Sequence, residues 1–229
     1  MTKIDIFSGF LGAGKTTLIK KLIAEAYKGE KLVLIENEFG DVGIDGGFLK
    51  DSGITINEMN SGCICCTLVG DFSKALEEVL EKYAPDRILI EPSGVGKLSD
   101  IIGAVSNVGD PDKVKINRFT AVVDAGKCKM YMKNFGEFFN NQIECAKTII
   151  LSRTQTTRQD KLDEAIELIR KHNAKAVIIA TPWDDIDGSA ILAAMEKTET
   201  FEEELLEEAR KIAEEHRHEH EHHHHHDHD

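Results

Sequence analysis

The chain contains no long apolar run, and none of its segments reaches the roughly 20 apolar residues that a membrane-spanning helix needs. Its first residues, MTKIDIFSGF, lack the apolar core and cleavage site of a signal peptide. Basic residues are also in the minority, and the formal net charge is −13. An acidic chain is poorly suited to the phosphates of nucleic acids or to anionic membranes. We therefore expect a cytoplasmic protein that binds neither nucleic acid nor membrane.

A disulfide framework is equally absent. The five cysteines are an odd number, and three of them are packed into Cys63-Ile-Cys65-Cys66. Disulfide-rich secreted domains have an even number of spaced cysteines, so this pattern favours a reducing compartment and another use for the thiols.

The 229 residues, 41% of them hydrophobic, suffice for one domain with a full core. Short apolar runs that are apolar throughout alternate with longer helical patterns, which predicts an α/β fold with a doubly wound, mainly parallel sheet buried on both faces. The strands are expected at residues 3–7, 31–35, 54–58, 87–90, 119–123, 148–151 and 176–180, and helices at 16–27, 68–83 and 161–172.

A phosphate-binding loop lies between the first expected strand and the first expected helix. The segment from Gly9 to Thr16, GFLGAGKT, matches GxxxxGK[ST] in the structural context that the motif requires. Glycines let successive backbone N–H groups face an anion, Lys15 can reach the β- and γ-phosphates, and the Thr16 hydroxyl can bind Mg²⁺. A glycine-rich turn without a ligand is the alternative. The motif in this context predicts a P-loop NTPase of the three-layer sandwich type.

Acidic residues follow two other expected strands, at the edge where parallel sheets bind ligands. Glu91 follows the strand RILI and has the place of the acid that holds Mg²⁺ in P-loop proteins, while Gly94 can bring its N–H to the γ-phosphate. Glu36, Glu38 and Asp41 follow the strand KLVLI. They can ligate a metal or orient the attacking water, although a solvated acidic loop explains their spacing equally well.

The cysteine cluster predicts a transition-metal site. Thiolates are soft ligands that suit Zn, Cu(I) and iron–sulfur chemistry, but three of them fall short of a closed tetrahedral zinc site. Such an open site suits metal transfer. Burial as small apolar residues and a redox pair are the alternatives. Cys128 and Cys145 stand alone and are expected to be structural.

Four motifs occur in a fixed order: GFLGAGKTT, ENEFG, GCICC and EPSG. Together they resemble the CobW/HypB/UreG family of metal-handling GTPases, most closely its CobW-like branch, over about residues 3–185. The resemblance implies a P-loop GTPase domain that binds Mg²⁺ and GTP, and nucleotide-controlled dimerisation or partner docking. It also implies delivery of Zn, Co or Ni to a client metalloprotein, or a role in cobalamin-related metallocentre assembly.

The resemblance also assigns residues. It places phosphate binding on the motif residues Gly12, Ala13, Gly14, Lys15, Thr16 and Thr17, and it places Mg²⁺ on Thr16 and Glu91. Transition metal falls on Cys63, Cys65 and Cys66, with Glu36 or Glu38 as a further ligand. Lys15, Glu38 and Glu91 are the expected catalytic residues.

The sequence departs from the family where guanine is read. An [NS]KxD sequence is expected after TIIL, but the chain has Ser152-Arg153-Thr154-Gln155. A Gln amide cannot accept both hydrogen bonds that guanine donates to an Asp carboxylate, and each unpaired buried group costs about 1–3 kcal/mol. Ser152, Arg153 and Gln155 are still the expected base-binding residues, because Arg153 can stack on a base. GTP remains the leading substrate, with ATP or broad specificity open.

The C-terminal part departs from the CobW-like pattern as well. After a domain spanning residues 1–200, the sequence leaves room for an acidic helix at 201–215 and a His-rich, disordered tail at 216–229, rather than for a smaller second domain. Imidazoles bind Zn, Ni, Cu and Co, so His218, His220 and His222 are candidate ligands in a flexible metal buffer. A purification tag is the alternative, but the histidines are interleaved with Glu and Asp.

These patterns favour a metallochaperone GTPase that couples GTP hydrolysis to metal delivery. Two alternatives stay open: a P-loop ATPase or small-molecule kinase of broad nucleotide specificity, and a metal-storage protein in which the P-loop only stabilises the fold.

Overall fold

The computed structural model describes residues 1–36, 55–58, 69–106 and 113–196, with the course of the backbone alone at 55–58 and 69–75. Within this part a seven-stranded sheet has the order β3-β2-β4-β1-β5-β6-β7, and all of its pairs are parallel. The strands are β1 (Thr2–Gly9), β2 (Leu32–Glu36), β3 (Thr55–Glu58), β4 (Arg87–Glu91), β5 (Val114–Asp124), β6 (Thr148–Ser152) and β7 (Val177–Ile179).

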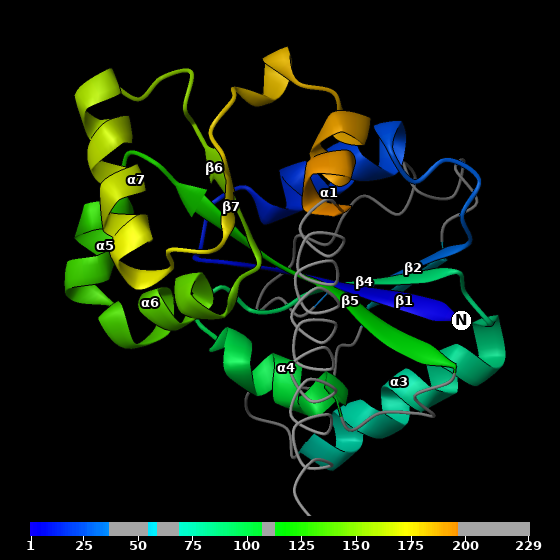
Figure 1. The fold of residues 1–229 in the computed structure, drawn as a ribbon. Helices are drawn as coiled ribbons and strands as arrows, with labels where there is room; N and C mark the ends of the chain where they lie inside the picture. Colours follow the sequence, from blue (N-terminus) through cyan, green and yellow to red (C-terminus); the bar gives the residue numbers. More distant parts are fainter. Residues whose placement is uncertain (37–54, 59–68, 107–112, 197–229) are drawn as a thin grey trace, which may run out of the picture.

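Helices cover both faces of this sheet (Figure 1). One face packs α1 and a helix at residues 188–196, whereas the other packs the remaining α-helices of the described part. The helices are α1 (Lys15–Glu25), α3 (Val69–Tyr83), α4 (Leu98–Ser106), α5 (Cys128–Asn134), α6 (Gly136–Cys145) and α7 (Gln159–His172), with a 3-10 turn η1 (Trp183–Asp185). The α/β, doubly wound, parallel sandwich expected from the sequence is therefore confirmed.

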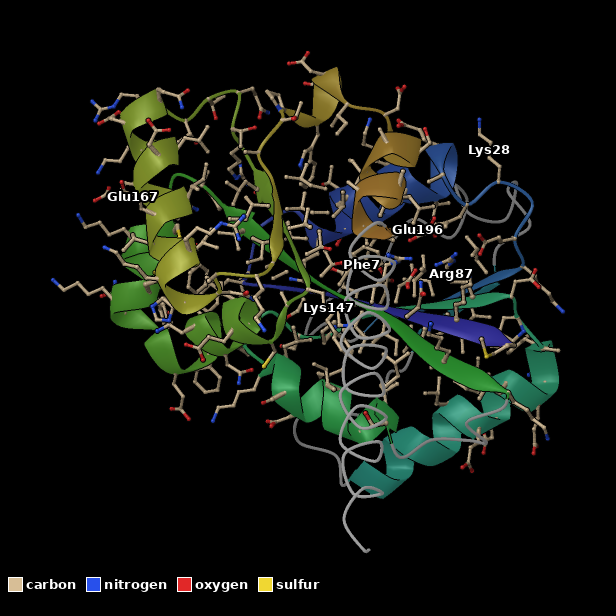
Figure 2. The ribbon with its side chains drawn as sticks, viewed as in Figure 1. Phe7, Lys28, Arg87, Lys147, Glu167 and Glu196 are labelled. Carbon is tan, nitrogen blue, oxygen red and sulfur yellow. The ribbon has the colours of Figure 1, made fainter. Side chains whose placement is uncertain are left out.

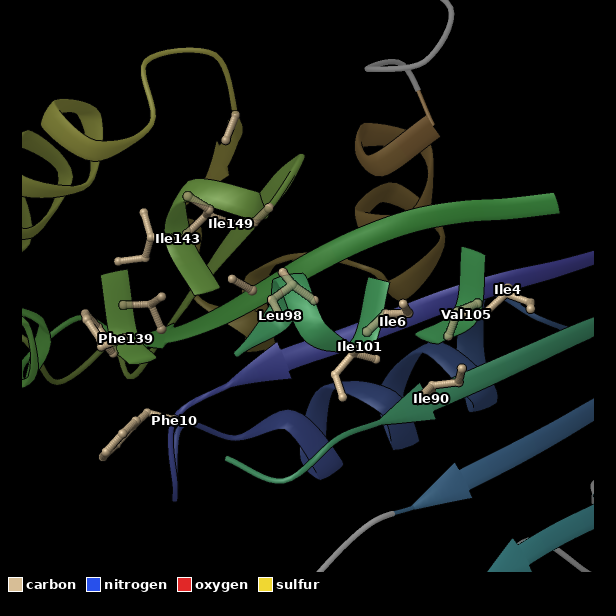
Figure 3. Close-up of a cluster of buried hydrophobic side chains, with 14 of the residues drawn as sticks. Ile4, Ile6, Phe10, Ile90, Leu98, Ile101, Val105, Phe139, Ile143 and Ile149 are labelled. Atoms are coloured by element: carbon tan, nitrogen blue, oxygen red, sulfur yellow. The ribbon is translucent and has the colours of Figure 1, made fainter. Parts of the chain in front are cut away.

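Two apolar cores explain why the strands are apolar throughout. On β1, Ile4 and Ile6 face the α4 and α6 side, while Phe7 faces α1. Successive side chains of a strand point to opposite faces, so a strand between two helical layers needs apolar residues in both registers. Figure 3 shows the first of these cores, in which Ile90, Leu98 and other labelled side chains converge.

A charged group is buried in the sheet where the sequence reads as an apolar strand. Asp5 is fully buried on β1 and forms an ion pair with Arg87, which is itself 2% exposed. Asn117 Nδ2 and Tyr27 Oη donate hydrogen bonds to the same carboxylate, at 2.8 and 3.2 Å. Arg118 lies 3.8 Å away and also pairs with Glu196 of the last described helix. A buried charge requires such partners, because burial without them is costly.

Figure 2 shows how the interior differs from the surface: Phe7 lies inside the molecule, whereas Lys28 and Glu167 project into solvent. No described helix combines the length and the apolar character that crossing a membrane requires.

The strand expected at 119–123 begins five residues earlier, at Val114, since its first half pairs with β1 despite its polar residues. Helices α4, α5 and α6 have no counterpart among the expected elements.

Candidate nucleotide site

The loop between β1 and α1 has the backbone of a phosphate cradle. Gly12 and Gly14 have φ values of 69° and 101°, in the left-handed region that only glycine adopts without strain. At Gly9 a Cβ atom would lie 2.5 Å from the carbonyl oxygen of Val122, so the loop passes too close to β5 for any side chain. Helix α1 begins at Lys15, directly after the loop, so that the partial positive charge of a helix N-terminus lies at the loop.

Lys15 and Thr16 stand at the start of α1 beside the carboxyl end of β4. Lys15 is 6% exposed, and its Nζ donates a hydrogen bond to the Gly9 carbonyl at 3.0 Å, across the loop. Thr16 Oγ1 lies 2.9 and 3.2 Å from the two carboxylate oxygens of Glu91, which is 2% exposed. The structure thus brings Thr16 and Glu91, the two residues expected at the Mg²⁺ site, into direct contact.

Glu36 ends β2 next to Glu91. The register pairs Glu36 with Glu91 on one side and with Glu58 of β3 on the other. Glu36 is buried, unlike an acid of a solvated loop. The Thr16 hydroxyl and two neighbouring carboxylates form a set of hard oxygen donors, the type that Mg²⁺ prefers, and they lie directly beside the phosphate loop.

Gly94 packs against the loop as well. A Cβ atom there would lie 2.7 Å from the backbone nitrogen of Leu11, so only glycine fits. Gln142 of α6 holds this segment, because its Nε2 donates to the carbonyls of Gly94 and Gly96 at 3.2 and 2.9 Å. Gln142 thus holds the segment after β4 against the P-loop.

A pocket of about 240 Å³ opens on the other side of the loop. It is small beside the roughly 300–1,000 Å³ that hold whole drug-sized ligands, and it suits one part of a nucleotide. Its walls come from the P-loop, the start of α1, the segment after β6 and η1, and its lining residues are Ala13, Gly14, Thr17, Ser152, Arg153, Gln155, Trp183 and Asp184.

Arg153 links this pocket to the loop. It has a φ of 58°, and its guanidinium donates to the Gly12 carbonyl at 3.1 Å while pairing with Asp124 at 3.0 Å. Asp124 ends β5 and is 3% exposed. The arginine therefore spans the gap between the P-loop and the ends of β5 and β6, with its flat face available for stacking on a base.

Other predicted site residues lie outside the described part. These are Glu38, the cluster Cys63, Cys65 and Cys66, and the tail histidines His218, His220 and His222. Within residues whose side chains the structure describes, no group of three or more His, Cys, Asp or Glu side chains is arranged to hold a metal ion.

The two isolated cysteines lie within the described part. Cys128 is fully buried, and burial raises the pKa of its thiol to about 12. Burial also raises the pKa of Cys145, which is half-buried. A raised pKa makes a thiol less reactive, because the thiolate is the reactive form.

A larger cavity, of about 590 Å³, lies elsewhere. Met1, Thr2, Pro85 and Lys113 are among the residues that line it, so it sits at the amino ends of the strands. Ligands of parallel α/β sheets bind at the carboxyl ends, where the P-loop lies, and the smaller pocket is therefore the better candidate.

The fold and this edge of the sheet define a P-loop nucleotide-binding protein. A sequence model described as "CobW/HypB/UreG, nucleotide-binding domain" matches residues 3–180. The chain belongs to the CobW/HypB/UreG family, as the resemblance of its motifs indicates.

Two relatives from Escherichia coli strain K12 illustrate the similarity. The chain is 29% identical to "Zinc chaperone YeiR" over 188 residues, which cover 82% of this chain and 57% of that protein. It is 31% identical to "Zinc chaperone YjiA" over 191 residues, which cover 80% of this chain and 58% of that protein. The chain thus spans little more than half the length of these relatives.

Solved structures agree with the fold. Zn(II)-bound YjiA GTPase from E. coli superposes with a TM-score of 0.61 at 23% identity, covering 82% of this chain and 62% of that one. HypB from Helicobacter pylori in complex with nickel gives a TM-score of 0.53 at 17% identity, covering 91% and 87%.

Three residues of the site were not anticipated from the sequence. Trp183 and Asp184 line the small pocket, and Asp124 holds Arg153. A signal existed for Asp124, because it directly follows an expected strand as Glu91 does, whereas Asp184 lies beyond Trp183 and had no such signal. Trp183, the single tryptophan of the chain, gave no comparable signal.

Proposed function

We propose that this chain hydrolyses GTP and couples the reaction to the handling of a transition metal. The observation that carries the proposal is the partly buried contact of Thr16 with Glu91 beside an intact P-loop, in a chain of the CobW/HypB/UreG family. Relatives named zinc chaperones favour zinc as the metal that is delivered. The structure of HypB in complex with nickel makes nickel a second candidate. Cobalt rests on the resemblance of the motifs alone.

The triphosphate is held by the curled backbone from Gly12 to Thr17. Successive N–H groups and the start of α1 offer hydrogen bonds and a partial positive charge to the β- and γ-phosphates. Lys15 Nζ, now on the Gly9 carbonyl, transfers its hydrogen bonds to the phosphates when the nucleotide binds. The charge that develops on the transferring phosphoryl group is then stabilised by donors already in place.

Thr16 and Glu91 are proposed to hold Mg²⁺, which neutralises charge on the β- and γ-phosphates when bound. The fit rests on the oxygen donors at this point: a hydroxyl, and a carboxylate that is 2% exposed. Gly94, which Gln142 holds beside Leu11, is proposed to donate its N–H to the γ-phosphate. Glu38 is proposed to orient the attacking water.

Glu36 is proposed to connect the nucleotide site with the metal ligands. It pairs in register with Glu91, and it is proposed to complete a site formed by Cys63, Cys65 and Cys66. Loss of the γ-phosphate would alter the segments that follow β2 and β3, and so release or capture the metal.

A second metal-binding region is proposed in the tail, at His218, His220 and His222. The proposal rests on the chemistry of the side chains, because imidazoles bind zinc and the tail places several of them among acidic residues.

The proposed partners are a client metalloprotein and, in the nucleotide-bound state, a second copy of this chain. Exposed apolar side chains occur next to the P-loop, where a partner would sense the nucleotide: Leu11, Val95, Phe135 and Phe138. Leu11 packs on Gly94, and Phe10 of the loop contacts Phe135 at a ring distance of 4.8 Å. The proposed location is the cytoplasm.

The test compares GTP and ATP turnover by the full chain and by a version ending at Glu215, each with and without one equivalent of Zn²⁺, Co²⁺ or Ni²⁺. GTP turnover that responds to metal, and that loses the response in C65S/C66S, supports the proposal. Equal or faster ATP turnover without a metal response contradicts it and favours an ATP-driven switch or kinase, for which Gln155 is the supporting residue.

A further inference from the structure

The small pocket beside the P-loop is lined by one carboxylate, that of Asp184, which lies outside the segment at the family's [NS]KxD position. Guanine presents N1–H and N2–H₂ as adjacent donors, and a site that reads it needs an acceptor for both. Gln155, at the position where the family has Asp, offers one carbonyl and two donors. Asp184 lines the same pocket as Gln155.

The placement of Asp184 follows from its neighbour. Trp183 Nε1 donates to the Leu151 carbonyl at 3.0 Å, and a Cβ at Gly14 would lie 3.1 Å from the indole ring. The indole ring of Trp183 therefore lies between the P-loop and the carboxyl end of β6. The Asp185 N–H bonds to the Pro182 carbonyl at 2.9 Å and closes the turn, which presents Asp184 beside the base-binding segment.

The Asp184 side chain is available for a ligand. It is exposed, and among the described residues none forms a hydrogen bond or an ion pair with its carboxylate. The nearby cation, Arg153, is engaged by Asp124 and Gly12. An ionised carboxylate has only acceptor sites, which complements an edge made of donors.

We propose that Asp184 is the specificity-determining residue of the base pocket and accepts the N1–H and N2–H₂ hydrogen bonds of guanine in place of the residue at position 155. The Gln155 amide is then free to donate to the guanine O6. This inference rests on the proposed GTPase function and names the element that selects its substrate.

The same carboxylate disfavours adenine. At the two positions that face this carboxylate, adenine presents the N1 lone pair and a C2–H, so the carboxylate would oppose a lone pair and find no N–H donor. A site whose polar groups pair with only one base rejects the other strongly, because unpaired groups lose their hydration without replacement.

The experiment measures binding of GDP, ADP and xanthosine diphosphate to the full chain with Mg²⁺ by calorimetry. Xanthine carries a carbonyl where guanine carries the N2 amine, so it requires a donor at that position. The variant Asp184→Asn supplies an amide donor, and Asp185→Asn removes the adjacent charge of the same turn without altering the pocket lining.

The expected result is that the unchanged chain prefers GDP over both other nucleotides. Asp184→Asn should weaken GDP binding about ten- to a hundredfold and shift the GDP-to-xanthosine-diphosphate affinity ratio towards xanthosine diphosphate, while Asp185→Asn leaves that ratio unchanged. Both nucleotides carry the same diphosphate, so the ratio of their affinities cancels any general effect of the lost carboxylate charge on phosphate binding.

If Asp184→Asn leaves the ratio unchanged, or if Asp185→Asn shifts it equally, the inference is wrong while GDP binding by the unchanged chain leaves the proposed function standing. A preference of the unchanged chain for ADP, or failure to bind any of the three, contradicts the GTPase proposal and the inference together.

Discussion

Single residues at this edge of the sheet differ in how far the sequence could predict them. Lys15, Thr16 and Glu91 were predictable because a motif fixes the first two and a strand end fixes the third, and the structure brings all three together. Trp183 and Asp184 were not, because their roles depend on contacts with Leu151 and Gly14, which are 32 or more positions away in the chain.

Arg87 is a second residue whose role only the structure shows. Its partner Asp5 lies 82 positions away in sequence, and the guanidinium also stacks 4.7 Å from the centre of the Tyr27 ring. Burial raises the pKa of Tyr27 well above its ordinary value, so the phenol remains protonated and donates to Asp5. The charges in this cluster depend on one another because none has access to water.

Arg87→Ala should therefore lower the free energy of unfolding by about 3–5 kcal/mol, because it leaves the Asp5 carboxylate buried without its main counter-charge. Urea unfolding followed by circular dichroism measures the change. Arg158→Ala is the matched control, since the Arg158–Asp160 pair is 74% and 63% exposed and should contribute less than about 1 kcal/mol. Equal losses in the two variants would contradict the assignment of Arg87.

At the scale of elements, the strands were easier to predict than the helices. A strand buried on both faces leaves an apolar run that is legible in the sequence, and each of the seven runs became a strand. Helices α4, α5 and α6 are only 7 to 10 residues long and were missed, because about two to three turns give too few repeats of the 3.6-residue pattern. The elements assigned to 201–215 and 216–229 remain predictions.

The helix at residues 188–196 packs beside α1, and a carboxylate of α1 caps its start. Glu25 accepts a hydrogen bond from the Gly188 N–H at 2.6 Å, at the start of the helix, and also pairs with Lys21. The bond from Gly188, followed by that from Lys21, lowers the pKa of Glu25 below its ordinary value. An anionic side chain at a helix N-terminus is favourable on general grounds.

The sign of the pH dependence follows from this lowered pKa. The contribution of Glu25 to stability is fully present above the pKa of an unfolded glutamate, about 4.3, and is lost as the pH falls through the lower pKa of the folded state. Glu25→Gln should thus reduce Tm at pH 7, and the difference from the unchanged chain should shrink below pH 4. Thermal unfolding at several pH values tests it, and a difference that grows in acid would contradict it.

At the scale of the whole molecule, an acidic chain exposes apolar side chains around its P-loop. Leu11, Val95, Phe135 and Phe138 belong to three different segments, yet contacts with Phe10, Gly94 and Lys97 bring those segments to one edge. Exposed apolar groups gathered at a functional edge indicate an interaction site. A second copy of the chain fits because an isologous contact would bring the two P-loop edges together.

Addition of Mg²⁺ and a non-hydrolysable GTP analogue should therefore raise the mass in solution from 25.5 kDa to about twice that value, as light scattering after size exclusion would measure. Phe138→Asp should keep the chain monomeric, since a two-fold axis would place two carboxylates in one apolar contact. Met130→Asp is the control, because Met130 is similarly exposed but lines a different cavity, on the α5 and α7 side. A dimer that persists in Phe138→Asp, or dissociates equally in Met130→Asp, would place the interface elsewhere.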